Sequence, residues 1–121
     1  MAKRFLIVDD SASMRQLVSF TVKDAGYDVL AAENGTEALA QLKGGRIDLV
    51  IADMNMPDKD SITFIRNLRG TAAYRFVPIV MLTRESQEAS RQEGRAAGAS
   101  GWIDAPFLPE KLLEVVKKFV R

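Results

Sequence analysis

Five short apolar runs, rich in β-branched residues, alternate along the chain with segments that show helical periodicity. The apolar runs cover residues 5–8, 27–31, 47–51, 77–82 and 101–103. The first, third and fourth runs are almost entirely apolar, which is typical of strands buried on both faces of a parallel sheet. Strands and helices that alternate through short connections form right-handed βαβ units. The pattern therefore predicts an α/β fold whose parallel sheet is covered by helices on both faces.

The segments between these runs carry two clear helical stripes. Near the N-terminus, helical spacing relates Met14, Leu17, Val18, Thr21, Val22 and Ala25. Near the C-terminus, the same spacing relates Leu112, Val115, Val116, Phe119 and Val120. Each set falls on one side of a helix, so each predicts a helix that buries one face.

Local signals predict where other helices begin and end. Asn34, with Glu37 three residues later, fits a capped helix start. Helix ends are expected at Gly26, Gly44 and Gly98. A fourth helix is expected from about Arg84 to Ala97. Because its apolar content is mostly alanine and its Gly94 costs about 1 kcal/mol relative to Ala, we expect this helix to be held less firmly than the others.

Composition limits the chemistry that the chain can carry. Its 121 residues fit one domain, and we expect a single domain over residues 1–121. Lys and Arg total 17 against 16 for Asp and Glu, so the net charge of +1 gives no general attraction to nucleic acid or to an anionic membrane. There is no cysteine and no histidine. Their absence excludes disulfides, thiolate or histidine metal ligands, Ser-His-Asp catalysis and the histidine role in a phosphorelay.

The start of the chain predicts its location. Lys3 and Arg4 precede an apolar run over residues 5–8. That run is too short for a signal peptide or a membrane span, so a cytoplasmic location is expected.

Four polar residues stand at the predicted carboxyl ends of the strands, where open α/β sheets bind their ligands. Asp9 and Asp10 follow the first strand, Asp53 follows the third and Thr83 follows the fourth. Each residue alone is typical of a helix cap or a turn. Because all four occur at one edge of the sheet, we expect them to meet in one crevice.

The residue types at this edge indicate phosphoryl chemistry. Clustered carboxylates repel one another, so raised pKa values or a bound cation are expected. Oxygen ligands without histidine suit Mg²⁺. A carboxylate beside Mg²⁺ is a competent nucleophile toward a phosphoryl group, and the Thr83 hydroxyl can donate to a phosphoryl oxygen after transfer.

Spaced motifs with these residues resemble one known family over the whole chain. The motifs are LIVDDS (6–11), IADMNMP (51–57), VMLT (80–83), GASGW (98–102) and Pro106-Phe107. The chain resembles the receiver domains of two-component response regulators, most closely the stand-alone chemotaxis type (CheY-like). The resemblance implies a flavodoxin-like, doubly wound sheet of five parallel strands in the order 2-1-3-4-5 with five helices. It also implies a monomer.

Carried over position by position, the resemblance implies roles for the site residues. Asp53 would be the phosphoacceptor. Asp10 and Asp53 would bind Mg²⁺ directly, Asp9 would help through water, and the backbone carbonyl of Asn55 would complete the protein ligands. Asn55 and Glu85 would influence the lifetime of the aspartyl phosphate.

The resemblance also implies a switch and its partners. Thr83 would turn toward the phosphoryl group while the ring of Trp102 moves inward; the alternative for Trp102 is an ordinary, partly buried aromatic residue. The helix 4–strand 5–helix 5 surface would then bind a target. The implied partners are a sensor histidine kinase, a flagellar motor switch protein or another target, and a phosphatase. The chain would not be an enzyme beyond its own phosphotransfer and dephosphorylation.

Several residues depart from the family pattern. Ala105 stands before Pro106 where the family has a lysine that pairs with the phosphoryl group and the acidic cluster, and Arg84 is a candidate substitute cation. Asp58 and Ser61 stand where glycine is frequent. The Ala105–Pro106 peptide bond is expected to be cis by resemblance.

The sequence leaves three alternative functions beside a switch that binds the flagellar motor. A phosphate sink for the kinase needs the same site without motor binding. A pseudo-receiver that binds without phosphate is favoured by Ala105. An aspartyl phosphohydrolase is disfavoured, because its nucleophile would follow the first strand in an Asp-x-Asp pattern that Asp9-Asp10-Ser11 does not fit.

Overall fold

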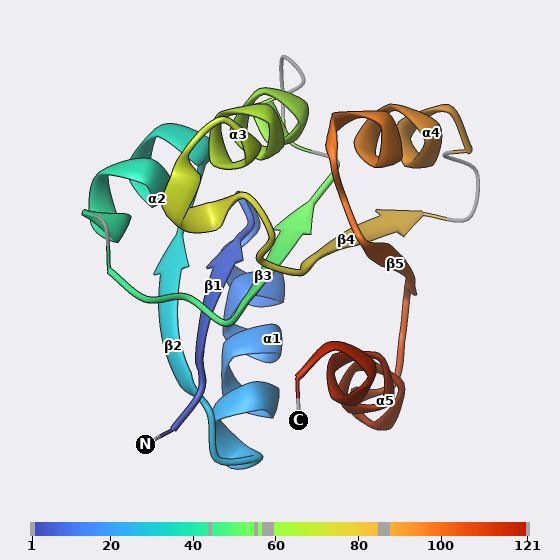
Figure 1. Ribbon diagram of the computed structural model, residues 1–121. Helices are drawn as coiled ribbons and strands as arrows, with labels where there is room; N and C mark the ends of the chain where they lie inside the picture. Colours follow the sequence, from blue (N-terminus) through green and yellow to red (C-terminus); the bar gives the residue numbers. More distant parts are fainter. Residues whose placement is uncertain (1, 44, 55, 57–59, 85–87, 121) are drawn as a thin grey trace.

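The strands and helices alternate along the chain in the computed structural model, which describes residues 2–43, 45–54, 56, 60–84 and 88–120 (Figure 1). The strands are β1 (Arg4–Val8), β2 (Asp28–Ala32), β3 (Leu49–Asp53), β4 (Ile79–Arg84) and β5 (Gly101–Ala105). The helices are α1 (Ala12–Asp24), α2 (Gly35–Leu42), α3 (Asp60–Arg69), the 3-10 turn η2 (Ala72–Tyr74), α4 (Glu88–Ala97) and α5 (Pro109–Phe119).

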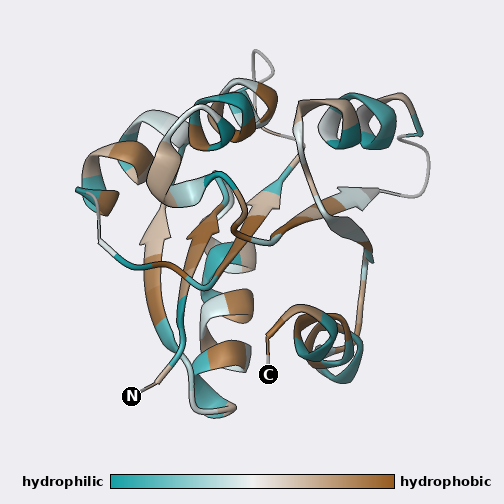
Figure 2. Cartoon of the chain, in the orientation of Figure 1, coloured by the Kyte–Doolittle hydropathy of each residue, from teal (hydrophilic) through white to brown (hydrophobic). Residues whose placement is uncertain are grey.

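The sheet has five parallel strands in the order β2-β1-β3-β4-β5, which confirms the predicted fold class. Helices α1 and α5 cover one face, and α2, α3 and α4 cover the other (Figure 1). Alternate residues of the central strands therefore enter two separate cores. Leu6 and Val50 pack on the α2–α4 side, whereas Ile7 and Ile51 pack on the α1–α5 side. Figure 2 shows the central strands β1 and β3 largely in brown, the hydrophobic end of the scale, whereas the edge strand β5 is pale.

The strand boundaries differ from the predicted ones at the edge that concerns function. Asp53 is the last residue of β3, and Thr83 lies inside β4 instead of following it. The predicted helix start at Arg84 is wrong, because Arg84 still pairs with Ala105 of β5. Pairing with β5 thus lengthens β4, and α4 begins at Glu88.

Helix ends agree with the local signals in most places. The Asn34 side chain accepts a hydrogen bond from the Glu37 amide at 2.8 Å, as predicted for the start of α2. Gly26 and Gly98 end α1 and α4 with φ of 99° and 123°. At the end of α2 the left-handed residue is Lys43 (φ 46°), because the chain turns at the C-cap itself; Gly44 lies outside the described residues.

Two helix predictions need correction or explanation. Leu17 does not belong to the buried stripe of α1, since it is 41% exposed while Val18 is buried; α1 is a helix at the surface with a narrow buried face. In α4, Gly94 is buried, and a β-carbon there would overlap the Sδ atom of Met81. The glycine therefore lets α4 approach β4 closely, which offsets its low helix propensity.

Candidate functional site

The three predicted carboxylates meet at the carboxyl edge of β1 and β3. These strands are neighbours with Val8 opposite Ala52, so the next residues, Asp9 and Asp53, come level with each other. Asp10 follows directly after Asp9. One carboxylate oxygen from each of these three residues lies within 4.8 Å of the other two. The structure thus brings together the acids that the strand-end argument selected.

Asp9 is the most buried member of this acidic cluster (Asp9, Asp10 and Asp53), with 1% of its surface exposed. Its Oδ1 accepts a hydrogen bond from the Ser11 amide at 2.9 Å. Its Oδ2 is buried without a donor among the described residues. A hydrogen bond between this oxygen and the neighbouring Asp53 carboxyl can form only if one of the two carboxyl groups is protonated. An oxygen in this position needs a proton or a cation.

Burial raises the pKa of Asp9 to about 7, and the neighbouring charges of Asp53 and Asp10 add to the effect, although the hydrogen bond from Ser11 opposes it. The sequence-based expectation of a raised pKa or a bound cation is confirmed for this residue. The three carboxylates can each offer one oxygen ligand, and the buried Oδ2 of Asp9 has no donor among the described residues. This set fits a hard divalent cation such as Mg²⁺.

This raised pKa makes a prediction about stability. Between about pH 4 and pH 7 the folded protein holds a proton on Asp9 that the unfolded chain has released, so metal-free stability falls as the pH rises through this window. We expect Asp9→Asn in EDTA to raise the free energy of unfolding by roughly 2 kcal/mol at pH 8 and to change it little at pH 4.

Urea unfolding at both pH values measures this difference. Asp28→Asn is the matched control, because Asp28 is an exposed acid on β2 outside the cluster. An Asp9→Asn gain of equal size at pH 4 and pH 8 would contradict the raised pKa.

Ser61 holds the strand end that carries Asp53. The Ser61 hydroxyl is buried in the first turns of α3 and donates a hydrogen bond to the Asp53 backbone carbonyl. The neighbouring Asp60 carboxylate accepts from the Gly35 amide at 2.6 Å and so joins α3 to α2. Sequence reasoning noted Ser61 only as a departure from glycine; no local signal indicates this contact, because the two residues are eight positions apart and meet through the fold.

Thr83 is fully buried and faces β5. Its hydroxyl donates to Oδ1 of Asp104, the residue directly opposite on β5, at 2.9 Å. The Arg91 guanidinium of α4 forms an ion pair with the same carboxylate oxygen, and its Nε lies 3.5 Å from the Thr83 hydroxyl oxygen. Sequence reasoning missed Asp104 and Arg91. The available signal was for Asp104 alone, an acid directly after the fifth apolar run and so at the same edge of the sheet as Thr83.

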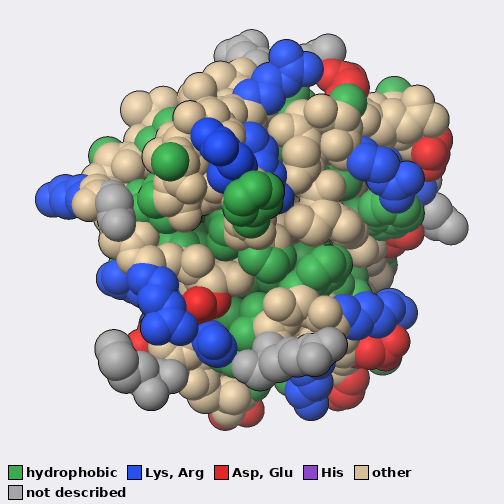
Figure 3. Space-filling model, in the orientation of Figure 1, with side chains coloured by type: hydrophobic (Ala, Val, Ile, Leu, Met, Phe, Trp, Pro, Cys, Tyr) green, Lys and Arg blue, Asp and Glu red, His purple; other side chains and the backbone are tan. Residues whose placement is uncertain are grey.

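Trp102 is partly exposed, at 37%, on the α4 side of β5. The guanidinium carbons of Arg95 and Arg91 lie 4.5 and 5.8 Å from its ring centroid, within the range of cation–π attraction. The two arginines of α4 thus cover the ring that the resemblance assigns to the switch. In Figure 3 basic and acidic side chains gather around hydrophobic ones along the edge of the molecule where Figure 1 draws α4 and β5.

Ala105 ends β5 with an uncharged methyl group, and the Ala105–Pro106 bond is cis, as the resemblance implied. The predicted residues Asn55, Glu85 and Asp58 lie outside the described part of the chain, as does the side chain of Arg84.

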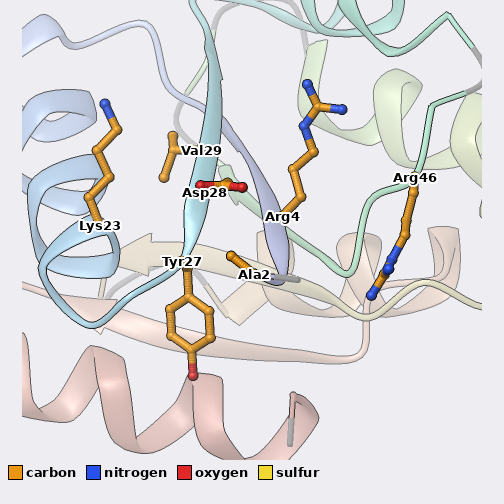
Figure 4. Close-up of a pocket in the computed structure, with 7 residues that line it drawn as sticks. All are labelled: Ala2, Arg4, Lys23, Tyr27, Asp28, Val29 and Arg46. Atoms are coloured by element: carbon orange, nitrogen blue, oxygen red, sulfur yellow. The ribbon is translucent and has the colours of Figure 1, made fainter.

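A hollow at the other end of the sheet lacks this chemistry. It lies beside the starts of β1 and β2 and is lined by Ala2, Arg4, Lys23, Tyr27, Asp28, Val29 and Arg46 (Figure 4). Asp28 is its single acid, and Arg46 is already paired with Asp48 at 3.1 Å. The candidate site is therefore the acidic cluster, because its three converging carboxylates can bind a cation, whereas the residues of this hollow cannot form such a site.

Comparison with known proteins agrees with this geometry. The model of the response regulator receiver domain family matches residues 5–117, so the chain belongs to this family. The crystal structure of chemotaxis protein CheY4 from Vibrio cholerae is similar over 99% of this chain and 100% of that chain, with 44% identity and a TM-score of 0.92. These findings establish a CheY-like receiver domain of two-component signalling.

Two further relatives mark the range of the family. The phosphate regulon transcriptional regulatory protein PhoB of Escherichia coli K12 is 35% identical over 121 residues. The chain spans about half the length of this relative, 53%. A receiver domain of a sensor histidine kinase from Pseudomonas aeruginosa PAO1 shares the fold (98% of each chain, TM-score 0.88) at 23% identity, and its structure holds a magnesium ion in the active site cleft.

No helix in the described part of the chain is long and apolar enough to cross a membrane.

Proposed function

We propose that the chain is a phosphorylation-dependent switch that takes a phosphoryl group from the phosphohistidine of a sensor kinase on Asp53, with the help of Mg²⁺. The observation that carries the proposal is the convergence of Asp9, Asp10 and Asp53, which leaves a buried carboxylate oxygen of Asp9 without a donor among the described residues. Asp53 suits the acceptor role because it ends β3 at the open edge of the sheet, where a phosphodonor can approach.

Mg²⁺ would be held by carboxylate oxygens of Asp10 and Asp53, with Asp9 acting through water, as the resemblance implies; the backbone carbonyl of Asn55 would complete the set. Bound there, the ion supplies positive charge that lets an anionic phosphodonor approach an anionic site.

In the transfer, a carboxylate oxygen of Asp53 forms a bond to phosphorus while the phosphorus–nitrogen bond of the donor imidazole breaks. The electron pair stays on that nitrogen, which takes a proton from water. The Thr83 hydroxyl donates to a phosphoryl oxygen as the group is transferred and keeps this bond in the product, which requires the hydroxyl to leave Asp104. Asn55 and Glu85 tune the hydrolysis that ends the signal. The chain does no other catalysis and is not an enzyme in the usual sense.

The output is binding through the surface of α4, β5 and α5. This surface carries the partly exposed Trp102 and the 70% exposed Leu108, beside a groove between β5 and α5 that Phe107 and Val115 help to line. Exposed apolar side chains with a polar rim suit a protein partner. The similarity to chemotaxis protein CheY4 supports chemotaxis, with a flagellar motor switch protein as the target. A phosphate sink, acting in the cytoplasm as a monomer, needs the same site without this target.

Ala105 favours a second candidate, a pseudo-receiver that binds its partner without phosphate. The site lacks the lysine that the family places there, so its fixed positive charge is reduced. In that case Asp53 would take no phosphoryl group.

One experiment separates these two functions. The protein is incubated with phosphoramidate, with Mg²⁺ or with EDTA, and its intact mass is recorded over time. A phosphoryl adduct that forms with Mg²⁺ and not with EDTA is the result expected of the switch. No adduct under either condition would overturn the switch and favour the pseudo-receiver.

A further inference from the structure

A charged cluster between α4 and β5 has no part in the transfer itself. Arg91 pairs with two carboxylates, Asp104 on β5 and Glu88 one turn back on α4 at 3.0 Å. Asp104 also accepts the hydrogen bond from Thr83 at 2.9 Å. Of these two carboxylates, only Asp104 contacts the buried Thr83 hydroxyl, which must turn toward the phosphoryl group.

The Thr83 hydroxyl has one proton to donate. In this structure that proton is used in a charge-assisted hydrogen bond to Asp104, a stronger type than a bond between neutral groups. Thr83 is fully buried, so no water replaces Asp104 as acceptor at low cost. The hydroxyl therefore turns toward the acidic cluster only by breaking this bond.

Arg91 keeps the acceptor in place. Its ion pair with Asp104 fixes the carboxylate beneath Thr83, and its guanidinium lies over the ring of Trp102. One arginine on α4 thus contacts both residues that the resemblance assigns to the switch. The Arg91 side chain is 15% exposed and the Asp104 side chain 45%, so the pair lies at the surface and salt weakens it in part.

We propose that Asp104, held by Arg91, is an autoinhibitory latch that keeps Thr83 and Trp102 in the unphosphorylated arrangement. This inference rests on the proposed function of the same site. Its consequence is a population shift. A molecule whose Thr83 has already turned can donate to the phosphoryl group as it is transferred, and the latch keeps the fraction of such molecules small. Removing the latch raises that fraction and the apparent reactivity by the same factor.

The test compares initial rates of adduct formation with phosphoramidate and Mg²⁺ in the parent, Asp104→Ala, Asp104→Asn and Glu88→Gln. We expect Asp104→Ala to react roughly tenfold faster than the parent. Asp104→Asn keeps an acceptor without charge, so an intermediate rate is expected. Glu88→Gln is the matched control, because it removes the other partner of Arg91 and leaves Thr83 untouched; its rate stays within about twofold of the parent.

A second measurement reads the switch without phosphate. In unphosphorylated Asp104→Ala, the NMR signals of Thr83 and of the Trp102 indole are expected to move toward their positions in the phosphorylated parent. Loss of folding would lower the rate instead of raising it, so a structural role is distinguishable from a latch.

The outcomes separate this inference from the proposed function. A parent that forms no adduct overturns both. A parent that forms the adduct, with Asp104→Ala reacting no faster and keeping the parent's signals, overturns the latch alone. An equal acceleration in Glu88→Gln also overturns the latch, because the faster rate would then come from the loss of any negative charge beside Arg91 and not from the release of Thr83.

Discussion

Asp53→Asn is expected to abolish the Mg²⁺-dependent phosphoryl adduct, lowering its rate of formation on the order of 10³-fold or more. The amide has nearly the shape of the carboxylate but is not a nucleophile at its nitrogen or oxygen under these conditions. Because Asp53 ends β3 and its backbone carbonyl still accepts from Ser61, the substitution is expected to leave the fold intact. The variant should also be more stable without metal, since one charge leaves the acidic cluster.

Intact mass after phosphoramidate treatment measures this loss, and circular dichroism verifies the fold. Asp28→Asn, which removes an exposed acid from β2, is the matched control and should form the adduct like the parent. An adduct of undiminished yield in Asp53→Asn would move the acceptor to another carboxylate and contradict the assignment.

Ala105→Lys is expected to strengthen the response to phosphorylation. Position 105 ends β5, one residue after Asp104, at the same edge of the sheet as the acidic cluster. An ammonium group there would add a fixed positive charge that Ala105 does not supply, and a hydrogen bond to a charged group contributes roughly 1.5–3 kcal/mol. The phosphorylated, switched state should therefore gain about 10- to 150-fold in population relative to the phosphorylated, unswitched state.

The change in Trp102 fluorescence per mole of adduct measures this coupling. Ala105→Met separates charge from bulk, because it adds a long side chain without an ammonium group. If Ala105→Met enhances the fluorescence change as much as Ala105→Lys does, the missing cation is not what limits the switch.

Much of this protein follows from the sequence alone. Continuous apolar runs and period-3.6 patterns need only neighbouring residues, so the alternation of strands and helices and the parallel sheet were predictable. The site was predictable for a related reason. Parallel strands end at one edge, and any acids placed directly after them, such as Asp9 and Asp53, must come together there.

The tertiary structure decided the points that depend on partners distant in the sequence. β4 extends through Arg84 because β5 pairs with it, and no local signal near Arg84 records that pairing. Leu17 has the spacing of the helical stripe but is exposed to solvent. Helical spacing shows which residues lie on one face of a helix, and it does not show how much of that face the rest of the protein covers.

The same reason explains the residues that were missed. Asp104 and Thr83 are 21 residues apart, and Arg91 meets them from α4, which packs closely on β4 at the buried Gly94. Local hydrogen bonding and hydrophobic patterning are encoded in short windows, so the sequence by itself determined the architecture and the acidic cluster. Which charged side chains meet across elements depends on how those elements pack, so only the tertiary structure revealed the contacts that hold Thr83.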